Sequence, residues 1–123
     1  MSLRSIPAIL VFTAVAAFGA ETRLTIRVSP LLSFAPANLM VRTVVAAHEE
    51  NRSIEVIAES AGFYRSSEIE LDGDRAPRTT MFEFRSLPSG VYEVRAILKG
   101  PGGNRLASAD RRINIIEGGA ADR

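Results

Sequence analysis

The residues of this chain best suited to chemistry are its one histidine and two of its methionines. His48 is followed by two glutamates, and a histidine beside carboxylates is a candidate metal ligand or general base. However, adjacent residues in a strand point to opposite faces, and this spacing is not that of a zinc site. We therefore interpret His48–Asn51 as a solvated polar turn. A copper site built from His48, Met40 and Met81 stays open as an alternative, because thioether and imidazole groups suit copper.

Acidic residues form a second candidate site for a metal ion. Glu68 and Glu70 precede the run Asp72-Gly73-Asp74, and their oxygens could hold calcium. The run lacks the long, spaced acidic series of a calcium-binding loop, so we favour an ordinary Asp-Gly turn. Asn51-Arg52-Ser53 matches the acceptor pattern for N-glycosylation, which matters only in a glycosylating compartment. We predict no metal and no cofactor.

Catalytic motifs are missing from the sequence. No serine lies in a Gly-x-Ser-x-Gly turn, and one histidine in a loop does not support a hydrolytic triad. Gly100–Gly103 is glycine-rich but lacks the lysine and the helix start that allow such loops to hold phosphate. We predict that the protein is not an enzyme, and that Gly100–Gly103 is a flexible hairpin loop.

Composition indicates one globular domain. The chain has 123 residues, of which 46% are hydrophobic and 24% charged, as in folded proteins. Its 15 basic and 14 acidic residues nearly cancel, which argues against nucleic-acid binding and against a polybasic membrane patch. Cysteine is absent, so burial of apolar side chains must stabilise the fold without disulfides.

The first twenty residues have the pattern of a secretory signal peptide. Arg4 precedes the uncharged, mainly apolar run Ile6–Phe18, and Ala17-Phe18-Gly19 supplies a small-x-small cleavage site, with cleavage after Ala20 as the alternative. The run is too short for a hydrocarbon core of about 30 Å, which needs roughly 20 residues. We predict a signal over residues 1–20, a periplasmic or secreted protein, and no membrane span after cleavage. A buried N-terminal helix or a retained anchor is the alternative.

Beyond the signal, apolar residues alternate with polar ones, which is the period of β-strands. Seven strands are predicted, over Leu24–Val28, Asn38–Ala47, Ser53–Ser60, Phe63–Leu71, Arg78–Leu87, Val91–Lys99 and Arg105–Ile116. Leu31–Ala37 is predicted to be an edge crossing, because Pro36 cannot donate to a ladder. Arg111 occupies an otherwise apolar face, which predicts a β-bulge near Asp110.

Alternating strands at this spacing predict an all-β sandwich of two antiparallel sheets over residues 21–117, followed by a flexible tail over 118–123. Both sheets must hide their apolar faces, so the inward residues of one should meet those of the other. Phe82 and Phe84 should contribute to this core, as should Tyr92 and its inward-facing neighbours on the same strand.

The run Leu87-Pro88-Ser89-Gly90-Val91-Tyr92-Glu93-Val94 resembles a turn and strand start of immunoglobulin-like and fibronectin type III-like domains of exported bacterial proteins. This resemblance implies that Tyr92 forms a tyrosine corner, its hydroxyl bonding back to the chain just upstream. Pro88 and Gly90 would then shape the turn. Tryptophan and the cysteine pair of antibody domains are missing, so a generic immunoglobulin-like sandwich is implied. Such families imply adhesion, spacing or docking.

We therefore expect an exported interaction or structural module whose partner is another envelope or extracellular protein. Ile57, Val44 and Met81 are apolar residues on outward faces, which often mark a contact surface. Pairing of a partner strand with a sheet edge is the mode to expect for a β-type interface. The alternative is a small periplasmic carrier of a ligand or of a copper or calcium ion.

Overall fold

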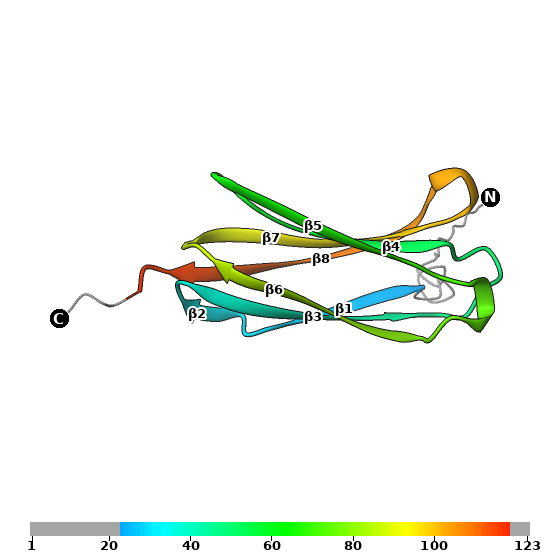
Figure 1. The fold of residues 1–123 in the computed structure, drawn as a ribbon, viewed down its shortest axis with the longest axis horizontal. Helices are drawn as coiled ribbons and strands as arrows, with labels where there is room; N and C mark the ends of the chain where they lie inside the picture. Colours follow the sequence, from blue (N-terminus) through cyan, green and yellow to red (C-terminus); the bar gives the residue numbers. More distant parts are fainter. Residues whose placement is uncertain (1–22, 119–123) are drawn as a thin grey trace, which may run out of the picture.

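The computed structural model describes residues 23–118, which form eight strands and two short 3-10 turns (Figure 1). The strands are β1 (Leu24–Ser29), β2 (Leu32–Phe34), β3 (Ala37–Val45), β4 (Ser53–Ser60), β5 (Phe63–Glu70), β6 (Thr79–Leu87), β7 (Gly90–Lys99) and β8 (Arg105–Ile116). The predicted signal peptide over 1–20 lies outside the described residues, as does all of the predicted tail except Gly118. Within residues 23–118, no helix is long and apolar enough to cross a membrane.

The strands form two sheets that pack face to face (Figure 1). One has the order β1-β3-β6 and the other the order β2-β8-β7-β4-β5. All neighbours are antiparallel except β2, which runs parallel to β8. The predicted all-β, two-sheet architecture is therefore confirmed.

The core lies between the sheets and follows the predicted alternation. In β7, for example, Tyr92, Val94, Ala96 and Leu98 are fully buried, while Val91 on the other face is exposed. Phe82 and Phe84 of β6 are buried as predicted. The other fully buried apolar side chains are Leu39, Val41, Ile54, Val56, Ala58, Leu87, Ile113 and Ile115.

Two strand-level predictions need correction. The segment predicted as an edge crossing does lie at an edge and cross between the sheets, but it also forms the short strand β2, which pairs with β8. The bulge predicted near Asp110 is absent, since β7 and β8 pair continuously through that residue. The register shifts instead opposite Lys99, which pairs with Arg105 after Leu98 has paired with Ala107.

The bulge was mispredicted because an inward-facing residue of β8 need not be buried. Arg111 does face inward from β8, but it lies beside β1 in a hollow and its side chain is exposed. The same holds at the other margin, where β5 diverges from the three-stranded sheet and is largely exposed (Figure 1). There the guanidinium of Arg65 lies 5.1 Å from the ring centroid of Phe63 and donates a hydrogen bond of 2.8 Å to the Arg85 carbonyl oxygen.

A side-chain hydrogen bond closes the turn from Pro88 to Tyr92. The Tyr92 hydroxyl donates a hydrogen bond of 2.8 Å to the carbonyl oxygen of Pro88, four residues upstream. Gly90 lies between them with a φ of +154°, and a Cβ there would come within 3.3 Å of Ser60. Burial raises the pKa of the Tyr92 hydroxyl, an effect that a hydrogen bond with Ser60 partly opposes.

Candidate interaction surfaces

The candidate copper ligands are not gathered in one place. Met40 and Met81 lie diagonally on the outer face of the three-stranded sheet, since Met40 pairs with Glu83 and Met81 with Arg42. His48 lies in the loop beyond the far end of β3, and its Nδ1 accepts a hydrogen bond of 3.0 Å from the Glu50 N–H.

The acidic candidates are also separated. Asp72 precedes a 3-10 turn, Gly73–Arg75, that carries the chain from one sheet to the other, and Gly73 has the positive φ of +56° expected of an Asp-Gly turn. Glu68 instead lies 3.6 Å from the ammonium of Lys99. Among the described residues, no group of three or more His, Cys, Asp or Glu side chains is placed to hold a metal ion.

The glycosylation acceptor pattern has a structural role in this fold. The Asn51 side chain is buried, and its amide Nδ2 donates a hydrogen bond of 3.0 Å to the Ala46 carbonyl oxygen. Its backbone carbonyl accepts a hydrogen bond from Gly73, which joins the turn after β3 to the turn after β5. The folded domain therefore does not present the Asn51 side chain to solvent.

Several large, exposed apolar side chains lie together on the outer face of the five-stranded sheet, where β2, β8 and β7 are neighbours. We call this surface the β2 patch, and it consists of Leu32, Phe34, Val91 and Ile116. Leu32 and Val91 both pair with Asn114 from opposite sides, and Phe34 pairs with Ile116, so all four point outward from the same sheet. Leu32 is 61% exposed, Phe34 62% and Val91 57%.

Polar interactions border the β2 patch. On one side, the Arg112 guanidinium lies 3.7 Å from the Glu93 carboxylate, one row further along the same face. On another, the Ser89 hydroxyl hydrogen-bonds the Glu117 carboxylate at 3.1 Å. An apolar centre within a polar rim is the anatomy of a protein interface.

The backbone of β2 also has a free side. The Leu31 carbonyl oxygen accepts from Asn114, and the Ala35 N–H donates to Ile116, so both residues bond toward β8. In a parallel pair, every second residue of a strand directs its backbone N–H and C=O toward the partner strand. The N–H and C=O groups of Leu32 and Phe34, which lie between the bonded residues, therefore point away from β8. Because β2 is an edge strand, that side has no partner strand among residues 23–118.

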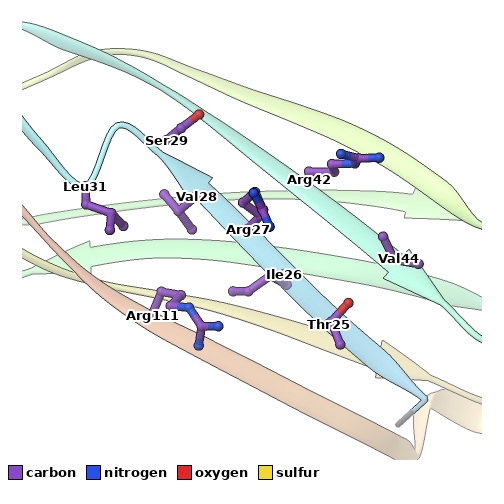
Figure 2. A pocket seen from close by; sticks show the side chains of 9 residues that line it. All are labelled: Thr25, Ile26, Arg27, Val28, Ser29, Leu31, Arg42, Val44 and Arg111. Atoms are coloured by element: carbon purple, nitrogen blue, oxygen red, sulfur yellow. The ribbon is translucent and has the colours of Figure 1, made fainter.

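A second surface is a hollow of about 650 Å³ beside β1 (Figure 2). Arg27 of β1, Arg42 of β3 and Arg111 of β8 are among the residues that line it (Figure 2). Val44 and Leu31 add apolar surface, and both are exposed. We call this hollow the arginine pocket.

None of the described residues that line the arginine pocket carries a carboxylate. Arg27 and Arg42 are direct partners in the pairing of β1 with β3, which places two like charges opposite each other. Neither forms an ion pair with a described residue. Like charges in this position destabilise a sheet.

The charges of a second hollow, near Gly100, contrast with those of the arginine pocket. Its Lys99 ammonium lies 3.0 Å from the Glu55 carboxylate and 3.6 Å from that of Glu68. The hydrogen bond to Glu55 raises the pKa of Lys99, an effect that desolvation opposes. The lysine therefore already has two acidic partners, whereas Arg27 and Arg42 of the arginine pocket have none among residues 23–118.

Sequence reasoning identified neither surface in full. Val44 and Met81 do lie on the outer face as predicted, exposed by 37% and 52%, whereas Ile57 is only half-exposed. The arginine pocket combines residues from three strands that alternation alone does not bring together. The β2 patch was missed because Leu31–Ala37 was treated as a crossing, although its two leucines and one phenylalanine were a visible signal.

Comparison with known proteins supports the fold and does not identify a family. No family model matches the chain, and no curated protein matches it. Among solved structures, it is similar to part of the crystal structure of a family 76 glycoside hydrolase from a bovine Bacteroides thetaiotaomicron strain. The TM-score is 0.54 at 17% identity, over 76% of this chain. The similarity covers 20% of that protein, so it shows a shared two-sheet fold in a fifth of a longer chain.

Proposed function

We propose that this protein is an exported, non-enzymatic interaction module, and that the β2 patch is the centre of its contact with another envelope or extracellular protein. The exposure of Leu32 and Phe34 on a three-residue edge strand is the observation on which this proposal rests. Burying an exposed side chain of this size is worth about 1.5–3 kcal/mol, so the patch can support specific binding.

The geometry of β2 favours binding through its side chains. Proteins often keep edge strands short to prevent uncontrolled pairing, and β2 is short enough to offer a partner few backbone hydrogen bonds. Leu32 and Phe34 must then provide most of the binding free energy. A partner strand beside β2 would extend the same contact.

We also propose that the sandwich is of the immunoglobulin-like type. Taken in chain order, the three-stranded sheet has the order A-B-E, and β8, β7, β4 and β5 have the order G-F-C-C′. The hydrogen bond from Tyr92 to Pro88 supports the same assignment, because a tyrosine corner bonds back to the chain just upstream. Domains of this type bind through exposed sheet faces and edges, and the fold alone does not select a function.

The absence of an enzymatic role is part of the proposal. In the described residues, the one histidine already uses Nδ1 as a hydrogen-bond acceptor for a neighbouring backbone N–H. The glycoside hydrolase activity in the name of the similar structure belongs to that protein, of which this fold matches a fifth.

A site-specific crosslinking experiment tests the contact. The full chain would carry benzoyl-phenylalanine in place of Phe34 and be irradiated in the cells that produce it. Tyr64 provides the matched control, since it is also aromatic, is 58% exposed and faces outward from the opposite edge of the same sheet. We expect one dominant adduct from position 34 and none from position 64.

A binding measurement then separates a true interface from incidental capture. The protein identified in the adduct would be purified and titrated with wild type and with the variant Leu32→Asp. We expect at least tenfold weaker binding of the variant, with an unchanged circular dichroism spectrum, because Leu32 is exposed in the free protein. Equal adduct formation at both positions, or unchanged affinity of Leu32→Asp, would refute the proposed contact.

Export has its own test. Cell fractionation should place the protein in the periplasm or the medium, and its N-terminal sequence should start at Ala20 or Glu21. Material that retains Met1 in the cytosol would contradict the proposed export and leave the contact to be judged by the crosslinking result.

A further inference from the structure

We infer that the arginine pocket binds an acidic, extended segment of a protein partner along the free edge of β1. This inference rests on the pocket alone and holds whether or not the β2 patch binds a partner. Its first basis is charge, because Arg27, Arg42 and Arg111 line one hollow to which residues 23–118 contribute no carboxylate. A guanidinium binds carboxylates through two parallel hydrogen bonds, which makes carboxylates the fitting ligands.

The second basis is the electrostatic repulsion between two of the arginines, which destabilises the sheet. Arg27 and Arg42 are direct cross-strand partners, and described residues supply no counter-charge to either. A bound carboxylate between them would remove this repulsion. Arg85, on the same outer face, lacks such a conflict, since it lies 3.3 Å from the carboxylate of Glu83.

The third basis is the backbone of β1, which favours a peptide over other anions. The Arg23 carbonyl oxygen accepts a hydrogen bond from the N–H of Ala46 in the loop after β3. From Arg23 onward, every second residue of β1 therefore directs its backbone N–H and C=O toward β3, and the residues between them direct theirs away. The N–H and C=O groups of Ile26 and Val28 therefore point away from β3, toward the side without a partner strand. An extended peptide could pair with them, as edge strands commonly do with peptide ligands.

This placement also predicts the spacing of acidic residues in the partner. A strand added to β1 would direct every second side chain to the outer face, where Arg27 and Arg42 lie. Arg111 lies on the other side of β1, on β8, and would meet a carboxylate from the alternate set (Figure 2). Acidic residues two positions apart would therefore both face the side of Arg27 and Arg42, and a carboxylate at the position between them would face Arg111.

Nuclear magnetic resonance titration of the isotope-labelled full chain tests this inference. The probe is an octapeptide of alternating Glu and Thr, and the control peptide has Gln in place of each Glu. With the glutamates facing Arg27 and Arg42, we expect amide shifts confined to residues 25–29 and 42–44, and affinity at least tenfold higher for the Glu peptide. Equal affinity for both peptides, or shifts centred elsewhere, would overturn the inference.

Variants assign the binding to the named arginines. Arg42→Gln should weaken binding of the Glu peptide at least tenfold, while the matched control Arg85→Gln on the same face should leave it unchanged. Because Arg42→Gln relieves like-charge repulsion, its melting temperature should equal or exceed that of wild type. Weaker binding together with a lower melting temperature would point to a structural role and contradict the inference.

A third titration distinguishes a protein partner from an anionic polysaccharide. An oligogalacturonate with the same number of carboxylates offers the charges without the peptide backbone. We expect it to bind at least tenfold more weakly than the Glu peptide. If it binds as tightly, the arginine pocket recognises carboxylates alone, and the assignment to an acidic protein segment is wrong.

Discussion

The hydroxyl of Tyr92 donates a hydrogen bond of 2.8 Å to the carbonyl oxygen of Pro88, and this bond joins the start of β7 to the turn that precedes it. The Tyr92 ring is fully buried and meets Phe63 edge to face, with ring centroids 6.1 Å apart. One side chain thus anchors both the turn and the contact of β7 with β5.

Replacing Tyr92 with Phe should keep the ring contacts and remove the hydrogen bond. The Pro88 carbonyl would lose its partner, so we expect the free energy of unfolding to fall by about 1–3 kcal/mol. Urea unfolding followed by circular dichroism measures this loss. Tyr64→Phe is the control, because Tyr64 is exposed and should change stability by less than about 0.5 kcal/mol. Equal stability of the two variants would show that the bond contributes nothing.

Stability should decline at alkaline pH, in part because of Tyr92. Burial raises the pKa of this phenol above its ordinary value of 10.0, so the folded state holds the proton more tightly than the unfolded state. The resulting stabilisation is fully present below pH 10 and is lost as the pH rises through the folded-state pKa.

In the variant Tyr64→Phe, Tyr92 is the one remaining tyrosine, and its ultraviolet absorbance reports its ionisation directly. We expect tyrosinate absorbance to appear only above pH 10, together with the loss of β-sheet signal. Ionisation at or below the ordinary value in a still folded protein would contradict the proposed cause.

Gly90 should not tolerate a side chain. Its φ of +154° is unfavourable for other residues, and an added Cβ would lie 3.3 Å from Ser60. We expect Gly90→Ala to destabilise the fold by about 1–3 kcal/mol. Gly62→Ala is the control, since a Cβ at Gly62 meets no atom within 4 Å. Thermal unfolding of both variants gives the comparison, and equal melting temperatures would disprove the expected strain.

Asn51→Asp should destabilise the fold in a pH-dependent manner. The substitution replaces the Nδ2 donor with a carboxylate oxygen that faces the Ala46 carbonyl oxygen. At pH 7 we expect a loss of about 1–3 kcal/mol or more, because a buried charged group loses its partner. At pH 4 the loss relative to wild type should be smaller, since a protonated carboxyl can donate again. Denaturant titrations at the two pH values test this, and a pH-independent loss would argue against the assigned bond.

Strand positions and inward faces were predictable because alternation is a local property. The buried set in β7 and the pair Phe82 and Phe84 follow from it directly. Which strands pair is not a local property, so the division into three and five strands was not predictable. The same limit explains why Arg111 suggested a bulge, since its exposure depends on what lies opposite β8. The burial of Asn51 was missed for this reason also, because its partners belong to two separate turns.

Not every inward-facing position of the five-stranded sheet is buried, and two of those that are exposed hold arginine, Arg65 on β5 and Arg111 on β8. Leucine or valine at either position would expose an apolar surface to water. The methylene groups of an arginine side chain can cover apolar core surface while its guanidinium remains in contact with water. Substituting either one with an aliphatic residue should therefore promote aggregation more than unfolding.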